Sequence, residues 1–136
     1  MPAHSNAYPW PSHYGHFRFF EQRMSAHQRV TAVRNRGGGV YELTLTGGAK
    51  FKVFICECYC FGEAEYVEVI GKLGPLDAIV ISSAWCSYTD DAKLAARTAE
   101  TGVFTIAEVM GALNKPEPWS HLTREQRERY AEARLI

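Results

Sequence analysis

Apolar and polar residues in the first half of the chain follow two different spacings. Residues 16–28 place Phe17, Phe20 and Met24 on one side at the spacing of an α-helix. Further along, β-branched residues and apolar–polar alternation are typical of strands. Gly47-Gly48 separates two of these strands and predicts a hairpin turn, because glycine accepts the positive φ that such turns require. The predicted strands span residues 30–35, 40–46 and 51–60.

The second half alternates short apolar runs with amphipathic stretches, a pattern typical of α/β proteins. Glu63–Leu73 has apolar side chains on one helical face, and Gly74-Pro75 ends this helix. Thr89 predicts the N-cap of a second helix, which carries a face of alanines. Thr123 and Gln126 have the spacing of a capping box and predict a charged C-terminal helix. The remaining predicted elements are strands at residues 78–81 and 103–106 and a short helix at residues 107–113.

These elements predict one α/β domain over residues 16–113, with a mixed sheet of about five strands flanked by helices. Antiparallel hairpins come first and parallel strands follow. Residues 1–15 contain two X-Pro bonds beside aromatic residues and predict an irregular arm, whose aromatic side chains pack against some other surface, for example that of a second subunit. Residues 114–136 are expected to form a linker and the C-terminal helix.

Length and composition agree with a single globular domain. The chain has 136 residues, of which 46% are hydrophobic, enough for a real core. No apolar run approaches the roughly 20 residues that a membrane-spanning helix needs. The first residues lack the apolar stretch of a signal peptide, so we expect a cytoplasmic protein.

The formal net charge of zero hides an asymmetry. Residues 1–53 hold seven Lys/Arg against two acids, whereas residues 54–113 hold three Lys/Arg against nine acids. A basic half can contact the phosphates of DNA or RNA. Alternatively, the two halves neutralise each other in the fold or across a dimer. The candidate nucleic-acid-binding residues are Arg29, Arg34, Arg36 and Lys50, together with the aromatic residues Trp85 and Tyr88.

Three of the four cysteines alternate along one predicted strand. Cys56, Cys58 and Cys60 should therefore share a face of the sheet. Zinc sites usually take their ligands from a C-x₂-C turn, and no histidine lies between residues 28 and 120 to complete such a site. We expect buried, reduced thiols that behave as small apolar side chains.

The clearest family signal is the stretch DAIVISSAWCSYTDDAKLAARTAETGVFTIAEVMGAL. Before it, the predicted order is helix, three strands and helix. Together they resemble the restriction-endonuclease-like superfamily, the PD-(D/E)xK nucleases, nearest to its Mrr-like branch. The resemblance covers roughly residues 29–113 and rests on element order and apolar pattern. It implies a three-layer core and a partner that is DNA or RNA.

In that family, Mg²⁺ is bound by one acidic residue on the second strand and by another on the third strand. A lysine follows the second acid by two positions, and together these groups activate water. By strand position, Glu42 and Glu57 match the two acids. Fourteen residues lie between them, compatible with a hairpin that sets them side by side. Tyr59 stands where the resemblance implies lysine, and a phenol supplies no positive charge. The remaining candidates are Lys72 as a displaced lysine and Glu63 or Glu65 as further metal ligands.

The same residues have structural alternatives. A mid-strand glutamate is costly to bury without a partner, so Glu57 is expected either in the metal centre or paired with Arg34 or Lys50 across the sheet. Glu42 lies on the same strand face as Thr44, which is typical of a solvated face. Trp85 and Tyr88 either pack in the fold or stack on bases. A serine or cysteine after residue 81 would need a histidine from one end of the chain to act as a nucleophile.

We therefore expect a nucleic-acid-binding or scaffold domain whose nuclease centre is degenerate. Two alternatives stay open: an active Mg²⁺-dependent nuclease with a displaced lysine, and a protein-interaction module that forms a homodimer.

Overall fold

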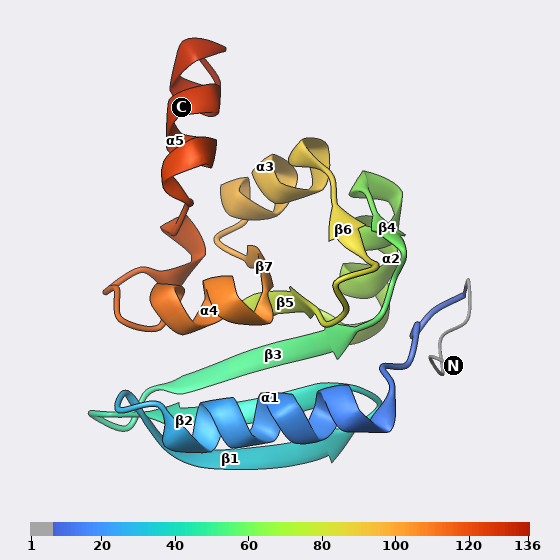
Figure 1. Cartoon of the computed structure of the whole chain (residues 1–136), viewed down its shortest axis with the longest axis vertical. Helices are drawn as coiled ribbons and strands as arrows, with labels where there is room; N and C mark the ends of the chain where they lie inside the picture. Colours follow the sequence, from blue (N-terminus) through green and yellow to red (C-terminus); the bar gives the residue numbers. More distant parts are fainter. Residues whose placement is uncertain (1–6) are drawn as a thin grey trace.

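The computed structural model describes residues 7–136, and the first six positions of the predicted arm lie outside the described residues. A five-stranded sheet forms the centre of the molecule (Figure 1). In spatial order, its strands are β1 (Val30–Gly37), β2 (Val40–Leu45), β3 (Lys50–Cys56), β5 (Ala78–Ile81) and β7 (Gly102–Thr105). The first three strands pair antiparallel, and β3, β5 and β7 pair parallel. The predicted α/β class with a mixed sheet is confirmed.

Helices cover both faces of the sheet. They are α1 (Tyr14–Ala26), α2 (Glu63–Leu73), α3 (Asp90–Thr98), α4 (Ile106–Ala112) and α5 (Arg124–Glu132), with a 3₁₀ turn at Pro118–Ser120. On one face, α1 and α4 bury Phe20 and Val109 in a first apolar cluster, and on the other face α2 and α3 bury Val69 and Ala96 in a second. The sheet is therefore the middle layer of three. A separate parallel pair is formed by β4 (Cys60–Phe61) and β6 (Ser87–Tyr88).

Two helices begin at the threonines that the sequence indicated. The Thr89 side chain accepts a hydrogen bond from the Ala92 N–H at 3.1 Å, which satisfies a backbone donor in the first turn of α3. Thr123 and Gln126 each accept the other's backbone N–H at the start of α5. Both predicted caps are confirmed.

The predicted strand over residues 51–60 is shorter than expected, because β3 ends at Cys56. Cys56 and Cys58 are buried in the second apolar cluster, whereas Cys60 is exposed. The expectation that all three thiols share one buried face is wrong, since the extended strand stops before the third cysteine. Burial raises the pKa of Cys58 to about 12, so that thiol stays protonated.

The described part of the N-terminal arm packs on its own chain. The Tyr8 ring stacks on Phe54 of β3 at 5.9 Å between centroids, and Trp10 meets Phe61 edge-on at 6.1 Å. Trp10 is only 4% exposed. The arm therefore contributes to the second apolar cluster rather than extending into solvent.

The C-terminal helix is tied to the domain by side chains. Tyr130 donates a hydrogen bond to Asp90 at 2.6 Å, and Arg129 forms an ion pair with the same carboxylate. These contacts lower the pKa of Asp90, the Tyr130 hydrogen bond having the largest effect. Within residues 7–136, no helix has the length and apolar character that crossing a membrane requires.

Candidate functional site

Glu57 lies just past the end of β3 and is 2% exposed. Its Oε1 accepts a hydrogen bond from the His13 backbone N–H at 3.0 Å and lies 3.1 Å from His16 Nδ1. His13 is the N-cap of α1, so the carboxylate also sits at the positive end of that helix. Glu57 thus fastens the end of β3 to the start of α1.

Neither cation that we expected beside Glu57 is its partner. Arg34 lies opposite Glu42 between β1 and β2, and the Lys50 ammonium donates to the Thr44 hydroxyl. The predicted pairing of Glu57 with Arg34 or Lys50 is wrong. His16, which is 41 residues away along the chain, takes that place.

A serine and a carboxylate meet the same nitrogen of His16. Ser82 Oγ, past the end of β5, lies 3.4 Å from His16 Nδ1, and Ser12 Oγ lies 2.8 Å from Ser82 Oγ. A serine nucleophile needs one imidazole nitrogen for itself and the other for the acid that orients the ring. With Glu57 and Ser82 both at Nδ1, this cluster does not have the geometry of a Ser–His–acid triad.

The neighbouring thiol is also a poor nucleophile. Burial raises the pKa of Cys86, and the nearby Glu57 carboxylate raises it further. Because the thiolate is the reactive form, this environment keeps Cys86 unreactive near neutral pH.

Glu42 and Glu57 lie on opposite faces of the sheet. Tyr41 and Leu43 point toward α1 in the first cluster, so Glu42, which alternates with them, points away from α1. Glu57 instead contacts the start of α1. The hairpin pairs Glu42 with Lys52, five residues before Glu57, and does not set the two acids side by side. They cannot share a metal ion.

At the level of Glu57, β2 places no carboxylate beside β3. Next to the end of β3, the residue that precedes β2 is Gly39, whose carbonyl accepts a hydrogen bond from the Ile55 N–H at 2.8 Å. A Cβ at Gly39 would lie 2.6 Å from the Ile55 oxygen, so only glycine fits there. Beyond it the chain turns back into β1, and the Glu57 N–H donates to Trp10 of the arm. The arm occupies the position beside Glu57.

The other expected members of a metal centre are scattered. Tyr59 is 69% exposed, and the Lys72 ammonium lies 5.5 Å from the centroid of the Tyr8 ring. Glu65 caps α2 through the Gly62 N–H, while Glu63 is exposed. Within residues 7–136, no group of three or more His, Cys, Asp and Glu side chains is placed to hold a metal ion. The residues present do not fit a Mg²⁺ centre.

The two aromatic candidates differ in their surroundings. Trp85, in the loop after β5, is 80% exposed and free to contact a partner. Tyr88 is half-buried, donates its hydroxyl proton to Glu108 at 2.7 Å and accepts from Gln126 at 2.7 Å. Burial, together with Glu108, raises the pKa of Tyr88. Of the two, only Trp85 is presented for stacking.

A buried lysine was missed by the sequence reasoning. Lys93 of α3 is 1% exposed, and its ammonium donates to the Val103 carbonyl at 2.7 Å beside the Phe104 ring. Burial lowers its pKa to about 8. In the sequence, Lys93 lies among the alanines of a helix face that was expected to pack on the sheet. That position was the available signal that the lysine side chain is buried.

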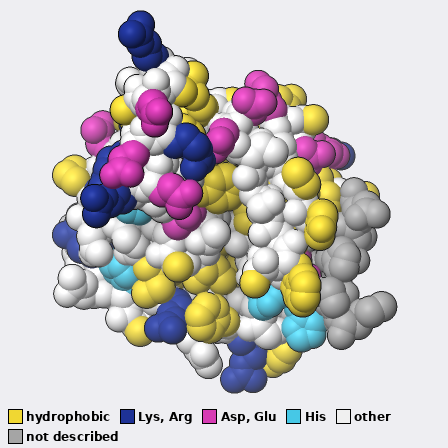
Figure 2. All heavy atoms as spheres, turned by 45° about the horizontal axis from the view of Figure 1, so that its top comes forward, with side chains coloured by type: hydrophobic (Ala, Val, Ile, Leu, Met, Phe, Trp, Pro, Cys, Tyr) yellow, Lys and Arg dark blue, Asp and Glu magenta, His cyan; other side chains and the backbone are white. Residues whose placement is uncertain are grey.

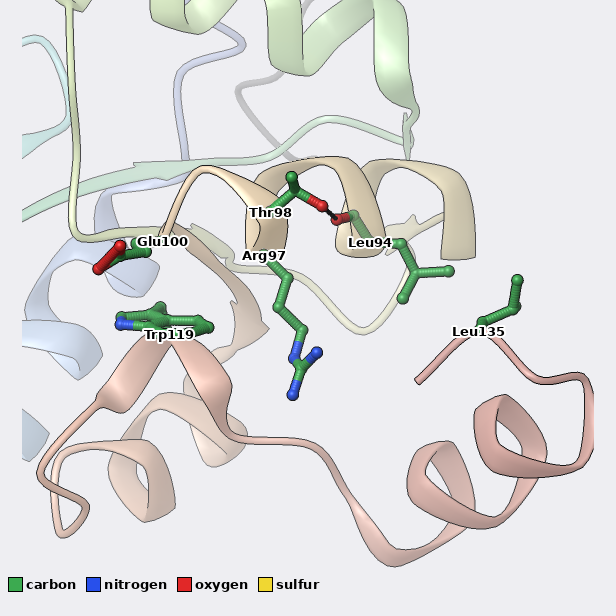
Figure 3. A pocket seen from close by; sticks show the side chains of 6 residues that line it. All are labelled: Leu94, Arg97, Thr98, Glu100, Trp119 and Leu135. Atoms are coloured by element: carbon green, nitrogen blue, oxygen red, sulfur yellow. Dashed lines mark hydrogen bonds between the residues drawn. The ribbon is translucent and has the colours of Figure 1, made fainter.

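A pocket at the far end of α3 contains an arginine that is also absent from the predictions. The Arg97 side chain extends into it beside Trp119 (Figure 3), and its guanidinium carbon lies 6.0 Å from the ring centroid. Glu100 lies on the opposite side of Trp119 from Arg97 (Figure 3), and Arg97 forms no ion pair within residues 7–136. Its Nε is buried and has no hydrogen-bond partner among these residues.

Comparison with protein-family models, with curated proteins and with solved structures finds no match to this chain.

Proposed function

We propose that this protein is a nucleic-acid-binding domain of restriction-endonuclease-like fold whose nuclease centre is degenerate. DNA or RNA is its partner. The binding surface is the basic region formed by α1 and the strands β1, β2 and β3.

The observation that carries the proposal is the unpaired positive charge of this basic region. Among residues 7–136, no Lys or Arg side chain of α1 or of the first three strands forms an ion pair with a carboxylate. In contrast, Arg124 and Arg129 of α5 both do. The excess charge is therefore free to contact phosphates, which supply most of the affinity for nucleic acids. The exposed cations are Arg34, Arg36 and Lys50 in the strands and Arg29 just before β1.

The acidic side chains are unevenly distributed over the surface. In the view of Figure 2, most of them lie in the upper half, interspersed with Lys and Arg side chains. Along the lower edge, the charged side chains are Lys and Arg. Such a separation favours approach of a polyanion from one side.

Two features support the assignment of a degenerate nuclease fold. The order of one helix, three antiparallel strands, a helix and two parallel strands agrees with the family that the sequence resembles. The two acids that would bind Mg²⁺ are Glu42 and Glu57, and they are on opposite faces. Glu57, moreover, is engaged with α1.

Binding is tested by fluorescence anisotropy of the full chain with labelled single-stranded DNA, duplex DNA and RNA over a range of salt concentrations. We expect affinity to fall steeply as salt rises. The variant Arg34→Ala/Arg36→Ala should lower the slope of log K against log salt by about 2, because each lost phosphate contact removes about 1. Arg124→Ala, at an exposed α5 arginine, is the matched control. Absent binding, or binding insensitive to salt, would refute the proposal.

The same preparation tests whether the nuclease centre is degenerate. Incubation of these substrates with Mg²⁺ or Mn²⁺ should produce no cleavage, and Glu57→Gln should behave as the wild type does. Metal-dependent cleavage that disappears in Glu57→Gln would instead establish an active nuclease.

A further inference from the structure

We propose that a pocket between α1 and the β1–β2 turn binds one unpaired nucleobase that carries an exocyclic amino group. This inference rests on the proposed nucleic-acid-binding function and names the part of the ligand that is recognised. The pocket has a volume of about 400 Å³, within the range of small-molecule sites. Its lining residues are Tyr14, Phe17, Arg18, Glu21, Asn35 and the glycines 37–39.

One wall of the pocket is bare backbone. Gly37, Gly38 and Gly39 have φ values of 87°, 62° and 87°, which only glycine adopts readily. A Cβ placed on Gly37 or Gly38 would meet no atom within 4 Å, so open space lies in front of these peptides. A flat ring can approach the turn closely there.

The opposite wall offers a stacking surface with a cation. Tyr14 is 68% exposed, and Arg18, one helical turn later, donates to its hydroxyl at 3.3 Å. The guanidinium carbon lies 5.8 Å from the ring centroid. Aromatic rings and guanidinium planes are the groups on which unpaired bases stack, and the arginine can also meet the adjoining phosphate.

The inner edge supplies a fixed hydrogen-bond acceptor. Glu21 Oε2 accepts from the Tyr41 hydroxyl and, at 3.4 Å, from the Asn35 amide. Burial and the Glu21 carboxylate together raise the pKa of Tyr41, which keeps this phenol protonated as a donor. Among residues 7–136, Glu21 Oε1 has no hydrogen-bond partner. A carboxylate held in this way accepts from the amino group of cytosine, guanine or adenine.

The same edge discriminates against bases without an amino group. Thymine and uracil present a carbonyl oxygen at the corresponding position, which a carboxylate repels. Duplex DNA keeps its amino groups in base pairs, so the pocket should accept single strands or extruded bases. The site therefore adds base preference to a surface that otherwise reads only phosphate.

The test measures the affinity of the full chain for short oligo(dC), oligo(dT) and oligo(rC) at one salt concentration. We expect oligo(dC) to bind about tenfold more tightly than oligo(dT). Tyr14→Ala should weaken both by about tenfold through loss of stacking. Glu21→Gln, which retains an acceptor for Tyr41, should remove the preference. Oligo(rC) shows whether the sugar matters, and Arg124→Ala is the control.

The outcomes separate this inference from the function on which it rests. Salt-dependent binding that is unchanged in Tyr14→Ala and Glu21→Gln, or equal affinity for oligo(dC) and oligo(dT), would overturn the pocket and leave the proposed function standing. Absence of binding to every oligonucleotide would overturn both.

Discussion

The two halves of the sheet use their charged side chains in opposite ways. Around the parallel strands, charged groups make internal contacts: Lys93 donates to the Val103 carbonyl, Glu108 accepts from Tyr88, and Asp90 accepts from α5. Around the antiparallel strands, Arg34, Arg36 and Lys50 are exposed, Lys52 is half-buried, and none of them forms an ion pair within residues 7–136. Charged groups in the first region are engaged within the fold, and charge in the second is available to a partner.

Glu57 stands where these two regions meet. It follows β3, which pairs antiparallel on one side and parallel on the other, and its carboxylate fastens α1 to that strand. A residue that the sequence marks as a candidate metal ligand thus has a structural role. A carboxylate at the end of a central strand must be interpreted from its partners, not from its position alone.

The largest expected effect tests the contact between Glu57 and the start of α1. Glu57→Ala removes the buried acceptor that connects His13 and His16 to the end of β3, so we expect a loss of about 2–4 kcal/mol in the free energy of unfolding. Urea denaturation followed by circular dichroism measures it. Glu42→Ala, at a half-buried residue on the opposite face with no ion pair within residues 7–136, should cost less than about 1 kcal/mol. Equal stabilities of the two variants would remove the distinction drawn between these acids.

A smaller effect on stability is expected at Lys93, which lies beside the parallel strands. Burial lowers the pKa of Lys93 from 10.5 to about 8, so between these values the unfolded chain binds more protons than the folded chain. The buried charge destabilises the native state most below pH 8, and this cost declines as pH rises. The stability of Lys93→Met relative to the wild type should therefore fall by about 2 kcal/mol between about pH 7.5 and 9.5.

Denaturant titrations of both proteins at the two pH values measure this change. The constant loss of the Lys93 hydrogen bond cancels in the comparison. Lys72→Met, at an exposed lysine of α2, is the matched control and should show no such trend. A pH-independent difference for Lys93→Met would mean that the ammonium is solvated in the folded protein.

The smallest expected effect lies on the antiparallel side. Arg34→Ala/Arg36→Ala should change the free energy of unfolding by no more than about 0.5 kcal/mol, because both side chains are exposed and unpaired. Thermal unfolding measures it. Destabilisation above about 1 kcal/mol would show that these arginines stabilise the fold, and the contrast between the two regions would then fail.

Local signals in the sequence determined most of the secondary structure. The apolar run at Ala78–Ile81 is a strand with those bounds, and Thr89 and Thr123 begin helices as expected. Caps and strands depend on neighbouring residues, so the order along the chain suffices to place them. The mixed sheet followed from the same order, because short hairpins give antiparallel pairs and helical crossovers give parallel ones.

The candidate site depended on the tertiary structure. The register of the hairpin pairs Glu42 with Lys52, and this alone puts Glu42 and Glu57 at different levels and on different faces. No local pattern joins Glu57 to His16 or Glu21 to Tyr41, because these pairs form only when α1 docks on the sheet. The sequence by itself determined the elements and their order. Only the packing of α1 decided which acid is buried and which borders an open pocket, since burial and partner choice depend on contacts between distant residues.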